Sequence, residues 1–374
     1  METPEFRRRL QDWLAGEATR LERFRTLPTD LDGQFAVLRD LQRLLHDAGW
    51  LRWGWPEAMG GLGGSPVLRG VLSEELAAAG YPPPFSFGMM EVLAPAVARF
   101  APEIAAWALP ALLRGDEAWC QGFSEPEAGS DLGSLRLRAV DEGEHWRVDG
   151  QKVWTSWAQY ADRCILLART GTQADGHRGI TALFVDMDSP GVTVRPLRAM
   201  SGDAEFAELF FDGVAVPKER TLGAVGGGWA VTMYVLSCER GAVAWQRQAW
   251  MHRRLADVIA EAAGAASPAW AGETFALLYA LRLASRRTLR RLADGEVPGP
   301  DASVDKVLMA SAEQLLFDGA LDFLPGTLVA GDDDTARTWR TGYFYSRAAS
   351  IYGGTSEIQR NILAERVLGL PRPA

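Results

Sequence analysis

The 374-residue chain contains only three cysteines and four histidines, and neither residue type is spaced as in a metal-binding or redox motif. Cys120, Cys164 and Cys238 lie far apart and form no Cys-x-x-Cys pair, whereas structural zinc sites use closely spaced Cys and His ligands. An odd number of separated cysteines also argues against a disulfide framework. We therefore expect a reduced, cytoplasmic protein without a bound metal.

Long apolar runs are absent too. No segment approaches the roughly 20 apolar residues that cross a bilayer, and the charged, amphipathic stretch from Met1 to Leu21 has no apolar core of signal-peptide length. The formal net charge of −9 argues against nucleic-acid binding through a general basic field. Lysine occurs only at positions 152, 218 and 306, which we interpret as coding bias. We predict no membrane span and no nucleic-acid partner.

Helical periodicity dominates both ends of the chain. Apolar residues repeat at helical spacing over 35–45 and 67–76, and 94–113 reads as a helical pair broken at Pro102 and Pro110. Four longer helical segments follow the middle region, at about 229–262, 270–294, 303–324 and 340–368. We expect an N-terminal α-helical domain over 1–116 and a C-terminal four-helix bundle over 225–374.

The region between them has the period of β-strands. Polar residues alternate with Leu135, Leu137, Ala139 and Val148, and 164–168 and 181–185 are short apolar runs. Asp149-Gly150, Asp175-Gly176 and Asp212-Gly213 are typical of turns between strands. The predicted fold class is therefore α+β, with a central β domain over 117–224.

A distinctive motif lies near the C-terminus: Ile351-Tyr352-Gly353-Gly354-Thr355-Ser356-Glu357-Ile358-Gln359-Arg360, continuing to Leu370-Pro371. It resembles the C-terminal signature of the acyl-CoA dehydrogenase family, and the resemblance extends over essentially the whole chain. In many members, the residue after the tyrosine is a glutamate, the base that removes the substrate's α-proton. Here it is Gly353, which cannot carry a proton.

Glu239-Arg240 is the candidate replacement. The pair follows Gly226-Gly227-Gly228 in an otherwise apolar segment, and it resembles the position from which the long-chain and isovaleryl branches supply their base. An apolar pocket raises the pKa of a glutamate and matches it better to proton abstraction. The alternative is an exposed charged pair on a helix. The resemblance also implies that Arg240 and Gly354 contact substrate and that the Gly353 N–H donates to the thioester carbonyl.

Two further motifs lie in the β region, Gln121 to Asp131 and Lys152 to Ser156. The resemblance implies that they bind FAD, with Trp154 packed on the ring, Ser156 directed at its N5 edge and Ser130 also beside the acyl chain. The alternatives are a surface turn for the first motif and a core tryptophan in the second. The full set of implied cofactor-binding residues is Gln121, Phe123, Ser124, Gly129, Ser130, Trp154, Thr155, Ser156, Thr355 and Glu357.

The implied function is FAD-dependent α,β-dehydrogenation of an acyl-CoA, fatty, branched or sterol-derived, with hydride transfer to flavin N5 and an electron-transfer flavoprotein as acceptor. The family forms oligomers, so we expect a homotetramer or a heterotetramer with a paralogous subunit.

The sequence departs from the family pattern in three places. Glu127 replaces a usual glycine, no Arg-x-x-Phe-Gly occurs between Gly241 and Pro300, and 324–328 lacks a Gln-x-x-Gly-Gly turn. They leave two alternatives, a flavin monooxygenase or oxidase on the same fold, and a supporting subunit of a heterotetramer.

Overall fold

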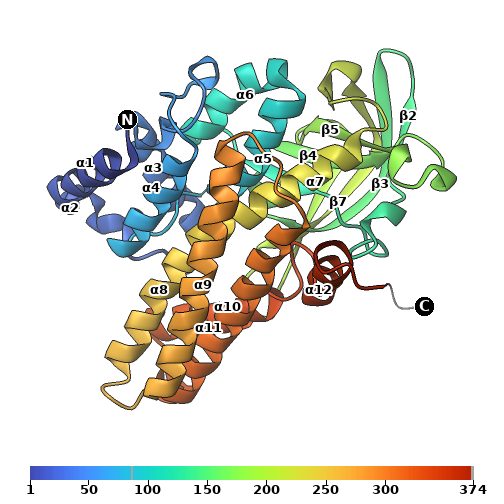
Figure 1. Cartoon of the computed structure of the whole chain (residues 1–374). Coiled ribbons are helices and arrows are strands. Elements are labelled where there is room, and N and C mark those ends of the chain that lie inside the picture. The colour runs from blue at the N-terminus through green and yellow to red at the C-terminus, as the bar shows by residue number, and fades with distance from the viewer. Residues whose placement is uncertain (86, 372–374) are drawn as a thin grey trace. The chain divides into compact units, whose positions relative to one another are not determined.

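The computed structural model describes residues 1–85 and 87–371. These residues form two units, each built from separate segments of the chain. Figure 1 labels their helices and strands. Unit 1 contains Met1–Thr29, Gly64–Pro83 and Ser237–Ala374, and unit 2 contains Asp30–Gly63 and Pro84–Leu236. The sequence predicts three domains, over 1–116, 117–224 and 225–374. These bounds differ from those of the two units and remain a prediction.

Unit 2 is organised around one eight-stranded sheet. Its strand order is β6-β7-β3-β2-β4-β5-β8, and β1 pairs in parallel with β4. The neighbours along this path are antiparallel except for β2 and β4. The strands are β1 Trp119–Gly122, β2 Arg138–Asp141, β3 His145–Ser156, β4 Arg163–Arg169, β5 Ile180–Asp186, β6 Val192–Leu197, β7 Phe206–Pro217 and β8 Thr221–Leu222.

The two apolar runs seen in the sequence form neighbouring strands. The run at 164–168 lies in β4 and that at 181–185 in β5, and both runs are buried. Continuous burial explains why these strands read as unbroken apolar runs. The loop between β4 and β5 contains the predicted turn Asp175-Gly176, within Gln173–Gly179, so these expectations are confirmed.

The other two predicted turns are wrong. Asp149-Gly150 lies inside β3 and Asp212-Gly213 inside β7, at a β-bulge in the ladder between these two strands. The Gly213 N–H donates to Asp149 Oδ1 at 2.8 Å, and Gly213 has φ of +62°. A bulge needs the same backbone freedom as a tight turn, so an Asp-Gly pair fits either one.

Helices complete unit 2: α3 Leu31–Asp47, α5 Phe87–Phe100, α6 Pro102–Arg114 and most of α7 Gly228–Cys238. A new helix begins at Pro102, as predicted, because proline fits the first helical turn. The predicted break at Pro110 is wrong. α6 continues through it and buries an apolar face that includes Ile104, Leu109 and Leu113, and this burial offsets the lost backbone hydrogen bond.

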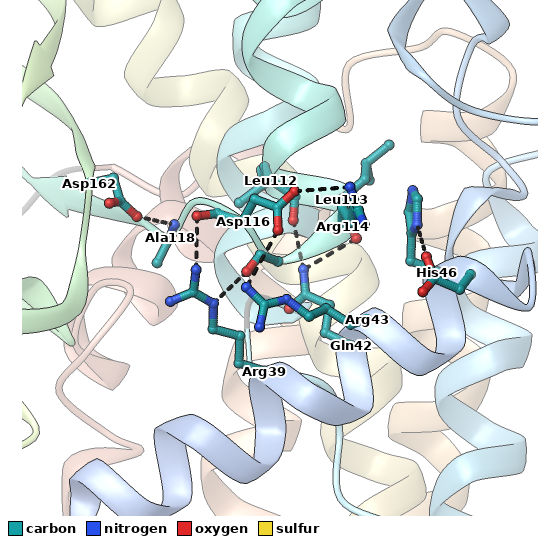
Figure 2. Close-up of polar contacts among 12 residues, drawn as sticks. Arg39, Gln42, Arg43, His46, Leu112, Leu113, Arg114, Asp116, Ala118 and Asp162 are labelled. Carbon is teal, nitrogen blue, oxygen red and sulfur yellow. Dashed lines mark hydrogen bonds and ion pairs between the residues drawn. The ribbon is translucent and has the colours of Figure 1, made fainter.

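The end of α6 is bound by side chains from α3 (Figure 2). Gln42 donates to the Leu112 carbonyl at 2.6 Å and Arg39 to the Gly115 carbonyl at 2.5 Å. These donors satisfy carbonyl groups that a helix end leaves without an intrahelical partner. A little further on, the Ala118 N–H donates to a carboxylate oxygen of Asp162 at 2.8 Å. The chain is thus fixed just before β1 begins.

Unit 1 is helical. Its core is formed by the long C-terminal helices and includes Leu278, Leu281, Leu316, Phe317 and Trp339. Its α-helices are α1 Thr3–Gly16, α2 Ala18–Leu21, α4 Val67–Ala78, α8 Ala244–Glu261, α9 Pro268–Ala293, α10 Ser303–Phe323, α11 Asp334–Ala348 and α12 Ser356–Ile362. Among the described residues, no helix is both long and apolar enough to cross a membrane.

Two of the four predicted C-terminal helices are interrupted. A π-helical turn, η8 Glu239–Val243, separates α7 from α8. The segment predicted as one helix over 340–368 is instead α11, a turn, α12 and another π-helical turn, η11 Leu363–Val367. Gly353 and Gly354 have φ of +64° and +94° in the turn before α12, and a right-handed helix cannot continue through such residues.

Candidate active site

The polar loop after β1 is held by a buried ion pair. Lys152 is fully buried on β3, and its Nζ donates to the Phe123 carbonyl at 3.0 Å and to Glu125 Oε1 at 2.8 Å. The Glu125 carboxylate also accepts from the backbone N–H groups of Arg136, at 2.7 Å, and Leu137, at 2.9 Å. Burial lowers the pKa of Lys152 to about 8, although Glu125 opposes the shift. Lys152 therefore keeps its charge at neutral pH and ties the loop to β3.

The same loop contains a tight turn. The backbones of Glu125 and Ala128 exchange two hydrogen bonds of 3.1 Å. Glu127, which replaces a usual glycine, is exposed and has no positive φ. The glutamate is thus compatible with the turn. The remaining candidates from this motif range from half-buried to exposed: Gln121, Ser124, Gly129 and Ser130.

A second β-bulge in β3 turns Trp154 away from the sheet. The register against β7 shifts between Lys152 and Thr155, where two residues of β3 oppose one of β7. Trp154 has φ of +61°, and its side chain is 64% exposed. A bulky residue in this region costs on the order of 1–3 kcal/mol, and such strain clusters at ligand-binding sites. The neighbouring Val153 N–H donates to the Ser124 carbonyl at 3.0 Å, so the bulge is bonded to the loop after β1.

Two hydroxyl groups follow Trp154 on β3. Thr155 is buried, and its Oγ1 has no hydrogen-bond partner within residues 1–85 and 87–371. Ser156 is half-buried at the end of the strand. An exposed aromatic face beside an unused buried hydroxyl is the arrangement expected for an aromatic ligand that forms hydrogen bonds.

In unit 1, Glu239 begins the π-helical turn that interrupts the α7–α8 helix. Single π-helical turns inside α-helices occur frequently at functional sites. The side chain is half-buried, and burial raises the pKa of Glu239 above its ordinary value, while the positive charges of Lys306 and then Arg240 partly oppose the rise. The predicted alternative, an exposed charged pair, does not describe this carboxylate.

Gly353 lies directly against the Glu239 carboxylate. A Cβ atom added to Gly353 would meet Glu239 Oε1 at 2.4 Å and Cδ at 3.0 Å. Those distances are shorter than van der Waals contact. Glu239 therefore fills the space that a side chain at position 353 would need. The structure brings these two predicted residues together although they are far apart in the sequence.

The turn around Gly353 leads into α12 in a defined way. Thr355 is the N-cap, and its Oγ1 accepts from the Ile358 N–H at 3.2 Å. Gln359 Nε2 donates back to the Gly353 carbonyl at 3.1 Å. Glu357 is exposed in the first turn of α12. The Gly353 N–H has no acceptor among the described residues.

Arg240, predicted to contact substrate, is half-buried beside Glu239. Its Nε is buried without a hydrogen-bond partner in the described parts of the chain. Burial lowers the pKa of its guanidinium, although Glu239 and then Asp305 oppose the shift. A buried guanidinium nitrogen without a partner is costly, and no contact within the described parts of the chain offsets this cost at Nε.

Three family models match this chain in sequence order. The N-terminal domain of acyl-CoA dehydrogenase matches residues 2–116, its middle domain 120–214 and its C-terminal domain 270–368. Together they cover most of the chain. The chain belongs to the acyl-CoA dehydrogenase family.

Relatives within the family resemble the chain over nearly its full length. Acyl-CoA dehydrogenase IpdE1 of Mycobacterium tuberculosis is 37% identical, with 99% of this chain and 98% of the relative covered. The steroid acyl-CoA dehydrogenase Tcur3481–Tcur3483 matches with a TM-score of 0.85 at 28% identity, covering 99% of this chain and 98% of the other. The ChsE4–ChsE5 complex of M. tuberculosis matches with a TM-score of 0.81 at 28% identity and the same coverage. The predicted family, fold class and enzyme class, an oxidoreductase, are thus confirmed.

Sequence reasoning missed the residues that support the site. Lys152 and Glu125 lie inside the two β-region motifs, but neither residue is predicted to have a role. From the sequence alone, the scarcity of lysine, Lys306 included, is interpreted as coding bias. The available signal was the scarcity of lysine in an arginine-rich chain: two of its three lysines are buried beside candidate residues, with Lys152 0% and Lys306 4% exposed. A buried lysine costs free energy, so retaining one indicates a specific contact.

Proposed function

We propose that this acyl-CoA dehydrogenase oxidises the Cα–Cβ bond of an acyl-CoA thioester and that Glu239 is the base that removes the α-proton. The observation that carries the proposal is the 2.4 Å separation between Glu239 Oε1 and a Cβ placed on Gly353. In many relatives the base extends from the position of Gly353. Here the carboxylate of Glu239, at the start of η8, occupies that space. The glycine at position 353 leaves room for this base.

The electrostatics of Glu239 suit this role. Burial raises its pKa, and a base with a raised pKa is a better acceptor for a weakly acidic α-proton. Lys306 and Arg240 oppose the rise, because nearby positive charges favour the ionised form of a carboxylate. The Gly353 N–H, which has no acceptor among the described residues, would donate to the thioester carbonyl and stabilise the negative charge that develops there. Gly354 and Arg240 would contact the substrate beside it.

Proteins of the family depend on FAD, which accepts the β-hydrogen of the substrate as a hydride at N5 when it is bound. We assign its isoalloxazine to the strained, exposed Trp154, the loop residues Phe123 and Ser124, and the hydroxyls of Thr155 and Ser156. The unused Thr155 hydroxyl and the outward-turned Trp154 fit such a group. The remaining proposed contacts are Gln121, Gly129 and Ser130 in the loop, with Thr355 and Glu357 at the start of α12.

We further propose a tetramer that contains a paralogous subunit, with an electron-transfer flavoprotein as acceptor. Two similar structures, Tcur3481–Tcur3483 and ChsE4–ChsE5, contain two components each, and this chain lacks two family motifs that hold the adenosine side of FAD. The word steroid in the description of the first of these makes steroid-derived acyl-CoAs the first substrates to test. Native mass spectrometry of the chain alone and after co-expression with a paralogue measures both assembly and flavin content.

The decisive experiment is anaerobic flavin reduction by a panel of acyl-CoAs. We expect Glu239→Gln to retain FAD and to reduce it roughly a thousandfold more slowly, within the range for one positioned acid–base group. The matched control is Glu273→Gln, an exposed carboxylate on α9, which should behave as the parent. A parent rate in Glu239→Gln would show that Glu239 is not the base. A flavin-free chain that binds FAD only with its paralogue would instead support the supporting-subunit alternative.

A further inference from the structure

Lys306 is a buried cation in unit 1 with an unusual set of neighbours. It lies on α10, is 4% exposed, and donates from Nζ to the Ala349 carbonyl. The same Nζ lies 4.2 Å from the centroid of the Tyr352 ring, within the range of a cation–π interaction. Ala349 directly follows α11, and Tyr352 directly precedes Gly353. Lys306 therefore contacts both ends of the short segment that leads to Gly353.

The charged groups around Lys306 come from three elements. Glu239 and Arg240 belong to η8, Glu313 to α10 itself, and Arg247 to α8. Glu313 is fully buried and already paired with Arg247, whose Nε donates to Oε2 at 3.0 Å. Of the two nearby carboxylates, Glu239 is thus the one that Arg247 does not neutralise.

Burial of this lysine requires compensation. Desolvation lowers the pKa of Lys306 to about 8, whereas Glu239 and then Glu313 oppose the shift and Arg240 and Arg247 add to it. The ammonium group therefore stays charged at neutral pH. Lys306 acts on Glu239 in turn: its positive charge lowers the pKa of Glu239 more than that of Arg240 does. An opposite charge placed nearby favours the ionised form of a buried carboxylate.

We propose that Lys306 is a positioning residue for the dehydrogenation, which holds the Ala349–Gly353 segment in place and provides a positive charge that favours the ionised form of Glu239. The inference rests on the proposed function, because it assumes that Glu239 is the base. It adds a role for a residue outside the motifs that resemble the family. The substrate-facing groups, the carboxylate and the Gly353 N–H, then depend on one buried ammonium.

The test compares two variants that differ in charge. Lys306→Gln removes the charge but keeps an N–H donor, and Lys306→Arg keeps the charge. The rate of anaerobic flavin reduction at saturating substrate is measured from pH 6 to pH 9. We expect the acid limb of the Lys306→Gln profile to move up by roughly one pH unit or more, so that the rate deficit is largest at pH 6 and fades towards pH 9. Lys306→Arg should keep the parent limb.

Controls separate this role from a structural one and from failure of the proposed function. Lys218→Gln, which removes a lysine of unit 2 paired with Asp141, should change nothing. Hydrogen exchange of 349–354 in the flavin-free protein should rise in Lys306→Gln but not in Lys218→Gln. A rate loss that is equal at every pH would show that the charge of Lys306 does not act on Glu239, and would overturn the proposal.

A parent-like pH profile in Lys306→Gln, together with a slow Glu239→Gln, would overturn this inference but leave Glu239 as the base. A parent rate in Glu239→Gln would overturn the proposed function itself. If Lys306→Gln does not fold, Lys306→Arg decides. An acid limb displaced by a unit or more in that charged variant contradicts the inference, and an unchanged limb supports it.

Discussion

At the scale of single residues, Gly353 shows how the absence of a side chain can be a requirement. Its φ of +64° lies in the left-handed region, and its missing Cβ leaves room for the Glu239 carboxylate. The two constraints are independent, because one concerns the backbone and the other a neighbour. Glycine satisfies both, and no other residue does so without cost.

We predict that Gly353→Ala lowers the rate of flavin reduction at least tenfold while FAD remains bound. The added methyl group must displace Glu239 Oε1 from 2.4 Å, and misplacing a catalytic group by about 1 Å costs on the order of a hundredfold in rate. The control is Gly264→Ala, since Gly264 has φ of +91° but nothing within 4 Å of an added Cβ. That variant should lose about 1 kcal/mol of stability and keep the parent rate. A parent rate in Gly353→Ala would show that contact between position 353 and Glu239 does not control the reaction.

At the scale of elements, the Glu125–Lys152 pair joins β3 to the loop after β1. Lys152 lies just before the bulge that exposes Trp154, and Glu125 lies just after Ser124. The pair thus anchors both motifs assigned to the flavin. A buried pair of this kind is weak evidence for stability, but removing one partner leaves an uncompensated charge.

We predict that Glu125→Gln destabilises the flavin-free protein by about 3 kcal/mol at pH 7 and lowers its affinity for FAD. Without the carboxylate, the folded-state pKa of Lys152 falls further below about 8. At pH 7, folding must then either remove the proton from the ammonium group or bury that group as an unpaired charge. At pH 9, Lys152 is neutral in the folded state of both proteins, and the deficit should shrink. Urea unfolding at the two pH values measures this stability deficit.

The control Glu127→Gln alters an exposed ion pair with Arg136 and should have little effect. A deficit that does not change with pH would contradict this account.

At the scale of the whole molecule, stability should depend on pH through buried carboxylates. Asp305 on α10 is fully buried. Desolvation raises its pKa to about 7, against the opposing influence of Thr288 and Arg287. Because the folded-state pKa exceeds that of the unfolded chain, about 3.9, the folded state binds this proton more tightly. The resulting stability is fully present below pH 4 and is lost as the pH rises through 7.

We predict that Asp305→Asn makes the flavin-free protein more stable than the parent at pH 8, by on the order of 2–4 kcal/mol, and equally stable near pH 4. The amide cannot ionise, so the variant does not lose stability between these values. Thermal unfolding across this range checks the prediction. Asp301→Asn is the control, because Asp301 is partly exposed and paired with Arg287 and Arg291. An Asp305→Asn protein with the parent's pH dependence would show that Asp305 does not titrate in this range.

The sequence by itself determined the family, the fold class and the main strands and helices. The apolar runs in β4 and β5 and the break at Pro102 are local signals, because burial and backbone chemistry act on the residues that carry them. The signature at Ile351–Pro371 identified the family, and Gly353 within it showed that the usual glutamate base is missing from that position. The same local reasoning failed at Asp149-Gly150 and Asp212-Gly213, since hydrogen bonding between β3 and β7 decides whether such a pair turns or bulges.

Only the tertiary structure decided which side chains meet. Glu239 and Gly353 are far apart in the chain. No pattern in the sequence predicts that the Glu239 carboxylate fills the space beside Gly353. The π-helical turn at Glu239, the left-handed Trp154 and the buried Lys306 likewise arise from packing between distant segments. Local propensity disfavours each of these features, and each persists because surrounding contacts compensate for its cost.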